Sequence, residues 1–282
     1  MALSQKKGPM HKKEFAALRV QPGMRLSLAD VPTAPTEPES EASRRQLREE
    51  TVRLSARLNK LQLRLHASGR RGVLLVLQGM DTSGKDGAIR HVFSHVSPLG
   101  VRAEPFGAPS DEERRHDFLW RVHAKVPKRG ELVIFNRSHY EDVLVTRVRG
   151  WVEKSVWERR YEHIRNFERM LHDEGMIVIK CYLHISKQEQ KKRLQARMDD
   201  PDKQWKLQPS DFDDRKRWDD FIEAYQDAIS ATSTEQAPWW VIPADSKPYR
   251  DRFLLQLLVD ELEGLNLVPP RPGFDISRMT LD

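Results

Sequence analysis

The sequence predicts an α/β fold in which a mainly parallel sheet of five strands lies between two layers of helices. Short apolar runs, rich in branched residues, alternate along the chain with longer segments whose apolar residues recur at helical spacing. The first run leads into a glycine-bounded loop and then into an amphipathic segment, which is the strand–loop–helix order of a phosphate-binding unit. Strands are expected near residues 73, 101, 131, 176 and 239.

Two different segments precede the first strand. Residues 1–42 carry basic clusters and a proline-rich stretch, a composition that buries little, so we expect an arm or linker. From about residue 43 to 67, leucines recur at alternating spacings of four and three and predict a helix that Gly69 ends. The narrow apolar seam of this helix packs either on the core or on another subunit.

Further helices are expected between the later strands. Ser186 and Glu189 form a capping box that opens a basic helix, and a broken stretch separates this helix from the next one. We interpret this helical pair, residues 187–231, as a lid inserted between the last two strands of a single domain over residues 43–267. Residues 268–282 are expected to form a tail. The other expected helices span residues 111–126, 152–172, 211–231 and 249–262.

The composition limits the classes of protein. No run of 18 apolar residues occurs and the first residues lack the apolar segment of a signal peptide, so a cytoplasmic protein without membrane contact is expected. The single cysteine, Cys181, excludes a disulfide within one chain and should be buried and reduced. The net charge of +6 indicates an anionic partner, and nucleic acid, a membrane surface and a polyanionic substrate all satisfy charge alone.

A phosphate-binding loop follows the first strand. Residues 79–85 match the spacing G-x-x-x-x-G-K. Glycines let such a loop curl so that its N–H groups point at a phosphate, and the following helix N-terminus adds partial positive charge. Lys85 supplies a full positive charge. The residues of the loop expected to bind phosphate are Gly79, Ser83, Gly84, Lys85, Asp86 and Gly87.

Two acidic residues depart from the usual form of this loop. Asp86 stands where nucleotide-hydrolysing loops carry a magnesium-binding Ser or Thr, and Asp81 lies inside the loop, where an uncompensated carboxylate would repel the phosphate. A cation must therefore intervene. We expect Asp81 either to meet the phosphate through Mg²⁺, with Mn²⁺ as a substitute, or to act as a base toward an acceptor phosphate. Asp86 suits the N-terminus of its helix.

A second polar segment, residues 136–142, follows the third apolar run. Asn136 occupies the position at which many phosphate-loop proteins hold a metal with Asp, and an amide oxygen binds Mg²⁺ more weakly than a carboxylate. Arg137 is expected to bridge phosphate oxygens, and His139 to support by hydrogen bonding. Alternatively, the charges of this segment satisfy one another. The expected metal ligands are Asp81, Asn136, Glu141 and Asp142.

The basic helix near residue 190 is the third candidate region. Arg193 and Arg197 lie four residues apart and share a face. A mobile helix that delivers guanidinium groups would stabilise the charge of a transferring phosphoryl group and exclude water. The alternative is an ordinary solvated helix face.

Three stretches, GMDTSGKDG, FNRSHYEDVLV and KKRLQARMDDPDKQWKLQPSDFDDRKRWDDF, together resemble the polyphosphate kinase 2 family in matching order over roughly residues 45–265. The resemblance implies a P-loop kinase-like sandwich similar to thymidylate kinase, with a lid and Mg²⁺. By this likeness, Asp81 and Lys85 correspond to the phosphate-loop pair of the family. Asn136 and Arg137 correspond to its second motif, and Arg193 to its lid arginine. The expected catalytic residues are Asp81, Lys85, Arg137 and Arg193.

The resemblance also implies a reaction, which is the reversible transfer of phosphate between inorganic polyphosphate and nucleotides. Because the form with Asn136 resembles the subgroup that accepts nucleoside mono- and diphosphates, AMP and ADP are the expected acceptors, with other purine nucleotides as alternatives. An ATP-dependent nucleotide kinase and a non-catalytic basic protein that binds polyanions or nucleic acid are the rival hypotheses. We expect no nucleic-acid partner and a homo-oligomer.

Overall fold

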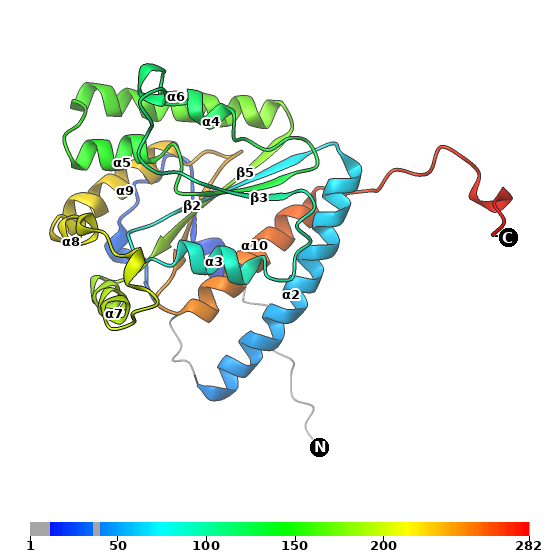
Figure 1. Ribbon diagram of the computed structural model, residues 1–282, viewed down its shortest axis with the longest axis horizontal. Helices are drawn as coiled ribbons and strands as arrows, with labels where there is room; N and C mark the ends of the chain where they lie inside the picture. The colour runs from blue at the N-terminus through cyan, green and yellow to red at the C-terminus, as the bar shows by residue number, and fades with distance from the viewer. Residues whose placement is uncertain (1–11, 36–39, 282) are drawn as a thin grey trace.

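The computed structural model describes residues 12–35 and 40–281, which build one sheet covered by helices (Figure 1). Within this part of the chain the strand order is β1-β6-β5-β2-β4-β3. Neighbouring strands pair in parallel, except that β1 runs antiparallel to β6. The five predicted strands are confirmed, and β1 is an addition. The strands are β1 (Arg19–Val20), β2 (Gly72–Gln78), β3 (Val101–Pro105), β4 (Leu132–Asn136), β5 (Met176–His184) and β6 (Trp239–Pro243).

Helices cover both faces of the sheet, which confirms the predicted three-layer sandwich. In Figure 1, α2, α3 and α10 lie on one face, α5, α6 and α9 lie on the other, and α7 and α8 stand beyond one edge. None of the described helices has the length and apolar character needed to cross a membrane. The helices are α1 (Lys12–Ala17), α2 (Glu41–Ser68), α3 (Lys85–Val92), α4 (Trp120–His123), α5 (Glu141–Val148), α6 (Lys154–Asp173), α7 (Lys187–Met198), α8 (Pro209–Lys216), α9 (Trp218–Thr232) and α10 (Lys247–Gly264).

The central strand β2 fixes the position of the phosphate loop. Its residues are all buried, because β4 and β5 flank it and helices cover both faces. Leu77 stands opposite Asn136, the last residue of β4, and opposite Cys181 of β5, which continues to His184. The ends of β2 and β4 therefore lie side by side, next to the last residues of β5. Ligands of open parallel sheets bind at this edge. The predicted burial of Cys181 is confirmed.

The N-terminal segment departs from the prediction of an arm that buries little. Residues 19–20 form β1 on the outer side of β6, and the leucines and valine around this strand enter the core. Gln226 of α9 accepts a hydrogen bond from the N–H of Leu28 at 2.8 Å, which anchors the segment further. A two-residue strand is too short to produce a recognisable alternating pattern. Residues 1–11 and 36–39 of the predicted arm, and residue 282 of the tail, lie outside the described residues.

The predicted helix over residues 111–126 is wrong. The structure has only a short 3-10 turn at Glu113–Arg115 and the single helical turn α4 there. His116 is extended, and the carboxylate of Asp117 accepts a hydrogen bond from the N–H of Leu119 at 2.9 Å. A short acidic side chain that bonds to a nearby N–H competes with the helical pattern of hydrogen bonds. The segment therefore forms a loop over the sheet edge.

The helices of the predicted lid, residues 187–231, are divided differently from the prediction. The expected helix over residues 211–231 is two helices, α8 and α9, which meet at Arg217. Phe221, Tyr225 and Ile229 of α9 are buried against the core, so this helix belongs to the layer beside α5 and α6. Within the described part of the chain, α7, α8 and the turn between them stand beyond the edge of the sheet, whereas α9 lies in the helical layer (Figure 1).

The long helix α2 packs on its own chain through the second half of its seam. Leu58, Leu61 and Leu65 are buried, and α10 is the helix against which α2 packs most extensively. This observation supports the core interpretation of the seam for that half. Farther toward the N-terminus of α2 the side chains are more exposed, as Val52 illustrates.

A buried ion pair ties the sheet to the helices that cover it. The Lys180 ammonium of β5 donates to the Glu168 carboxylate of α6 at 2.6 Å, to the carbonyl of Thr232 at 2.7 Å and to the Tyr140 hydroxyl at 3.1 Å. Burial opposes the ionisation of Glu168, but Lys180 and His139 together outweigh burial and lower the pKa of this carboxyl. Tyr140 belongs to the polar segment of residues 136–142 after β4, so this ion pair also anchors the site.

Replacing Lys180 by Met should lower the free energy of unfolding by about 3–5 kcal/mol, because it leaves a buried carboxylate without its counter-charge. Urea unfolding at pH 7 measures this change. The matched control is Lys154→Met, which removes an exposed pair with Glu158 and should cost about 0.5 kcal/mol or less. Equal effects of the two substitutions would contradict this interpretation.

Candidate active site

The phosphate loop connects β2 to α3 through a tight curl. A Cβ on Gly79 would lie 2.6 Å from the hydroxyl of Ser83 and 2.9 Å from the carbonyl of Leu183, so a side chain does not fit there. Gly84 caps α3 with a φ of +98°, a conformation that glycine adopts without strain. The first turn of α3 begins directly after it. The geometry therefore matches the predicted anion site at a helix N-terminus.

Lys85 is held at the floor of this loop. Its ammonium donates to the carbonyl of Gly79 at 2.6 Å and to that of Met80 at 3.3 Å, and its side chain is buried. Burial, together with the positive charge of Arg137, lowers the pKa of Lys85 to about 8, against the opposing effect of the nearby carboxylates. At mildly alkaline pH, Lys85 is therefore protonated in only a fraction of the molecules.

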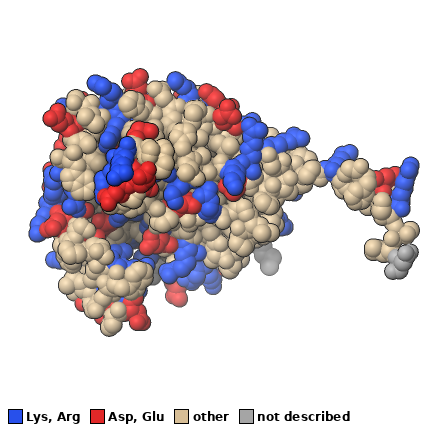
Figure 2. All heavy atoms as spheres, turned by 45° about the horizontal axis from the view of Figure 1, so that its top comes forward, with Lys and Arg blue, Asp and Glu red and all other residues tan. Residues whose placement is uncertain are grey.

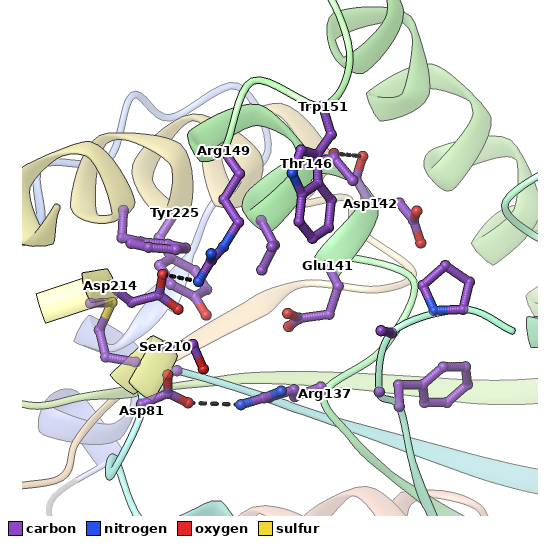
Figure 3. Close-up of a pocket in the computed structure, with 18 of the residues that line it drawn as sticks. Asp81, Arg137, Glu141, Asp142, Thr146, Arg149, Trp151, Ser210, Asp214 and Tyr225 are labelled. Carbon is purple, nitrogen blue, oxygen red and sulfur yellow. Dashed lines mark hydrogen bonds and ion pairs between the residues drawn. The ribbon is translucent and has the colours of Figure 1, made fainter. Parts of the chain in front are cut away.

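Asp81 and Arg137 form the ion pair at the centre of the site (Figure 3). One Nη of Arg137 donates to the Asp81 carboxylate at 2.7 Å. Arg137 has a φ of +62°, which is unusual for a residue with a side chain, and its N–H donates to the carbonyl of Leu77 at 3.1 Å. Strained backbone of this kind persists where the surroundings fix it, and it concentrates at functional sites.

Glu141 lies beside the Asp81–Arg137 ion pair in Figure 3. Burial raises the pKa of Glu141, while Arg137 and Lys85 act in the opposite direction. This glutamate begins α5, a helix of eight residues that the sequence analysis did not predict. Its neighbour Asp142 points away from Asp81 toward Arg121, at 3.5 Å, and Arg160, at 3.9 Å.

Asn136 and Asp86 contact each other instead of Asp81. The amide of Asn136 donates to the Asp86 carboxylate at 2.8 Å, and Lys206 lies 3.6 Å from the other oxygen of Asp86. Burial alone would raise the pKa of Asp86, but the hydrogen bond from Asn136 and the charge of Lys206 lower it overall. Asp86 therefore stays ionised at the start of α3, where the helix dipole favours it.

The four predicted metal ligands do not come together as one cluster. Glu141 lies beside the ion pair of Asp81, Asn136 is bonded to Asp86, and Asp142 is paired with arginines. Within residues 12–35 and 40–281, no group of three or more His, Cys, Asp or Glu side chains is arranged to hold a metal ion. Mg²⁺, however, commonly binds through one or two carboxylates together with substrate phosphates. Asp81 and Glu141 fit that mode of binding.

Arg193 holds the phosphate loop through hydrogen bonds to its backbone carbonyls. Its Nη1 donates to the carbonyls of Thr82 and Ser83 at 3.0 and 2.9 Å, and its Nη2 donates to those of Ala244 and Asp245 at 2.6 and 3.1 Å. The Nε donates to Glu189 at 2.8 Å, so the five N–H groups of the guanidinium all have acceptors. The sequence predicts that Arg193 faces the transferring phosphate. In the structure Arg193 instead connects α7 to the loop and to the residues after β6.

The same helix supplies a supporting residue that the sequence analysis missed. Gln190, one turn before Arg193 on the same face of α7, donates to the carbonyl of Asp81 at 3.2 Å.

The capping box predicted at the start of α7 is only half formed. Ser186 accepts the N–H of Glu189 at 3.0 Å, but the Glu189 carboxylate pairs with Arg193, and Asp245 accepts the N–H of Ser186 at 2.8 Å.

Two cavities meet at the Asp81–Arg137 pair. The first has a volume of about 360 Å³ and the second about 600 Å³, and they share Asp81, Phe106, Gly107 and Arg137. Lys and Arg outnumber Asp and Glu around the second cavity, whereas both signs are interspersed over the outer face in Figure 2. The basic residues that line the second cavity are Lys85, Arg90, Arg137, Arg193, Arg197, Lys203, Lys206, Lys247 and Arg250.

The first cavity combines apolar walls with charged residues deeper inside. Trp151, which is 61% exposed, lies at its edge, and Phe106 and Tyr225 line it further. Arg149 extends into it and pairs with Asp214 of α8 (Figure 3). The sequence analysis did not single out these residues, because they come from elements distant in the chain and carry no motif.

Comparison with known proteins gives a consistent result. The family model described as polyphosphate kinase 2 matches residues 41–267. The AMP/ADP-polyphosphate phosphotransferase of Meiothermus ruber is 54% identical over 229 residues, which are 81% of this chain and 86% of that protein. The ADP-polyphosphate phosphotransferase of Rhodopseudomonas palustris is 43% identical over 226 residues, which are 76% of this chain and 78% of that protein. The crystal structure of polyphosphate kinase 2 from Arthrobacter aurescens TC1 superposes with a TM-score of 0.86 at 45% identity and covers 93% of each chain.

Replacing Arg193 by Lys should be nearly as harmful as replacing it by Met, because one ammonium cannot satisfy four carbonyls. We expect both variants to lose about 10²-fold in kcat/KM for phosphoryl transfer, the scale of loss when a reacting centre is misplaced. Both should also exchange the amide hydrogens of residues 79–84 faster. If Lys retained most of the activity, charge near the phosphate would be the role of Arg193.

The affinity for long-chain polyphosphate should fall as the pH rises through about 8, because Lys85 loses its proton there and with it the charge that attracts the anion. Titration calorimetry between pH 6.5 and 9.5 measures this dependence. The matched control is Lys85→Arg, whose guanidinium stays protonated over the whole range. The same fall in both proteins would assign the dependence to another group.

Proposed function

The chain belongs to the polyphosphate kinase 2 family, and we propose that it transfers phosphate from inorganic polyphosphate to AMP and ADP. One observation carries this proposal beyond the family assignment. Two cavities of different character, one strongly basic and one partly apolar, share the Asp81–Arg137 pair in their walls. A phosphotransferase needs such a pair of sites for a donor and an acceptor that meet at one point.

The basic cavity suits the phosphate donor. Polyphosphate carries negative charge along its whole length, and a groove lined by lysines and arginines attracts it from solution and holds several of its phosphates at once. The phosphate loop and the N-terminus of α3 form one wall of this cavity, next to Lys85. Arg197 lines it as well, a position that supports the phosphate-binding role predicted for it.

The partly apolar cavity suits the nucleotide acceptor. Trp151 and Phe106 offer aromatic surface for a base, and Arg121 and Arg149 offer positive charge for its phosphates. The Meiothermus ruber relative is named for both AMP and ADP, and the open rim of this cavity is compatible with acceptors of either length. The choice of AMP and ADP as acceptors rests on these two points.

The proposed mechanism is direct in-line transfer. Lys85 and Arg137 hold the transferring group between donor and acceptor, and positioning with charge stabilisation supplies most of the catalysis for this type of reaction. Asp81 and Glu141 would hold Mg²⁺, which neutralises charge on the phosphate oxygens when it is bound. Because donor and product are both phosphoanhydrides, the reaction should run in either direction with concentration.

The decisive assay incubates the protein with Mg²⁺, polyphosphate and either AMP or ADP and separates the nucleotides by chromatography. We expect ADP and ATP to form only when polyphosphate is present. Lys85→Ala should reduce the rate by about 10³-fold while the protein stays folded, because it removes a charge aimed at the transferring group. Circular dichroism and the unfolding midpoint provide the control for folding.

Other outcomes would select a rival function. Product formed from AMP and ATP without polyphosphate would indicate an ATP-dependent nucleotide kinase. Binding of polyphosphate or nucleic acid without turnover, with only a partial loss of affinity in Lys85→Ala, would indicate a polyanion-binding protein. Absence of ADP and ATP formation under every condition would overturn the proposal.

A further inference from the structure

Arg250 of α10 is a buried arginine that contacts the phosphate loop and has no role in the mechanism above. Its side chain is 1% exposed, yet it lines the basic cavity beside Gly84 and Gly87. A Cβ on Gly84 would collide with Nη1 of Arg250 and would lie 3.4 Å from its Cζ. The space left by the absent side chain of Gly84 is therefore occupied by this guanidinium, directly against the N-terminus of α3.

The guanidinium is held in one orientation by its neighbour in the sequence. The Asp251 carboxylate accepts hydrogen bonds from Nε and Nη2 of Arg250 through the same oxygen, at 2.8 and 2.6 Å. The other oxygen of Asp251 lies 3.1 Å from Nδ1 of His91, at the end of α3. Asp251 is thus fixed from two sides, and it turns the third nitrogen of Arg250, Nη1, toward Gly84.

Nη1 of Arg250 is buried and has no hydrogen-bond partner within the described part of the chain. Buried donors are nearly always paired, so an unpaired charged donor calls for an explanation. Its location against the cap of α3, at the wall of the basic cavity, indicates an anionic acceptor. A phosphate oxygen held by the loop is such an acceptor.

Positive charges also outnumber negative charges around Arg250. Nη1 of Arg193 would lie 3.5 Å from the same Cβ on Gly84, and Lys247 is one turn earlier in α10. Burial, partly offset by Asp251, lowers the pKa of Arg250, and burial with the charges of Arg193 and Arg250 lowers the pKa of Lys247. Asp251 pairs with Arg250 and Glu189 pairs with Arg193, so two carboxylates face three cations beside the loop. A bound polyanion would compensate the remaining positive charge.

We propose that Arg250 is a phosphate-binding residue of the donor site, whose Nη1 donates to an oxygen of the polyphosphate chain bound at the N-terminus of α3. Asp251 is its positioning residue. Gly84 is then required for two reasons, the backbone conformation of the cap and the room for this guanidinium. The identity of the donor rests on the proposed function.

The test compares two buried arginines of the same helix. Arg250→Met should raise the KM for polyphosphate about tenfold or more, through the loss of a charge-assisted hydrogen bond, and leave the KM for ADP within about twofold. Arg252→Met is the matched control. Arg252 is equally buried and pairs with Glu50 of α2 away from the cavity, so its loss should lower the melting temperature without changing either KM.

Two more variants distinguish binding from support of the fold. Arg250→Lys should recover part of the affinity for polyphosphate, because it keeps the charge. Asp251→Asn should weaken polyphosphate affinity by less than Arg250→Met does. It loosens the orientation of the Arg250 guanidinium, but the guanidinium and its charge stay in place. Titration calorimetry with tripolyphosphate should give the lowest dissociation constant for the wild type and the highest for Arg250→Met. The constants for Arg250→Lys and Asp251→Asn should lie between these two.

An unchanged KM and an unchanged tripolyphosphate affinity in Arg250→Met would overturn the inference, as would equal changes in Arg250→Met and Arg252→Met. Failure of the proposed function would look different. If the wild-type protein does not use polyphosphate as a donor, the titration with tripolyphosphate still decides whether Arg250 binds phosphate.

Discussion

The site is built around one electrostatic constraint, a carboxylate inside a loop that is shaped to bind anions. Asp81 would repel phosphate from the N–H groups around it unless a positive charge stays close. In the structure that charge is Arg137, at 2.7 Å. The arginine reaches Asp81 because β4 ends level with β2 and because its backbone adopts a left-handed conformation tied to the carbonyl of Leu77. A divalent cation that arrives with the substrates would take over this compensation.

The surrounding elements keep the loop in place from three sides. Lys85 binds the carbonyls at its start, Arg193 binds the carbonyls near its end, and Arg250 fills the space beside Gly84. Carbonyl oxygens turned toward these cations leave the N–H groups of the loop directed to the other side. The loop therefore owes its shape to long basic side chains from α3, α7 and α10 as well as to its own glycines.

Much of this structure could be predicted from local patterns in the sequence. The buried strands and the phosphate loop were predictable because a run of branched residues followed by G-x-x-x-x-G-K has few other meanings. What could not be predicted depends on contacts between distant residues. The sequence marks Arg193 as a basic residue on a helix but does not tell whether it faces a phosphate or a carbonyl. Asp142 has the residue type of a metal ligand, yet Arg121 and Arg160 surround it. Arg250 and Trp151 belong to no motif, and only the fold brings them to the site.

The most direct test of the central claim is the anomalous diffraction of crystals grown with Mn²⁺, ADP and polyphosphate. The account predicts a Mn²⁺ peak about 2.1 Å from an oxygen of Asp81, bridging to phosphate oxygens in the region where the two cavities meet. Bound phosphates with Asp81 still paired to Arg137 and no metal beside it would contradict the account. A metal bound only at Asp86 would contradict it equally.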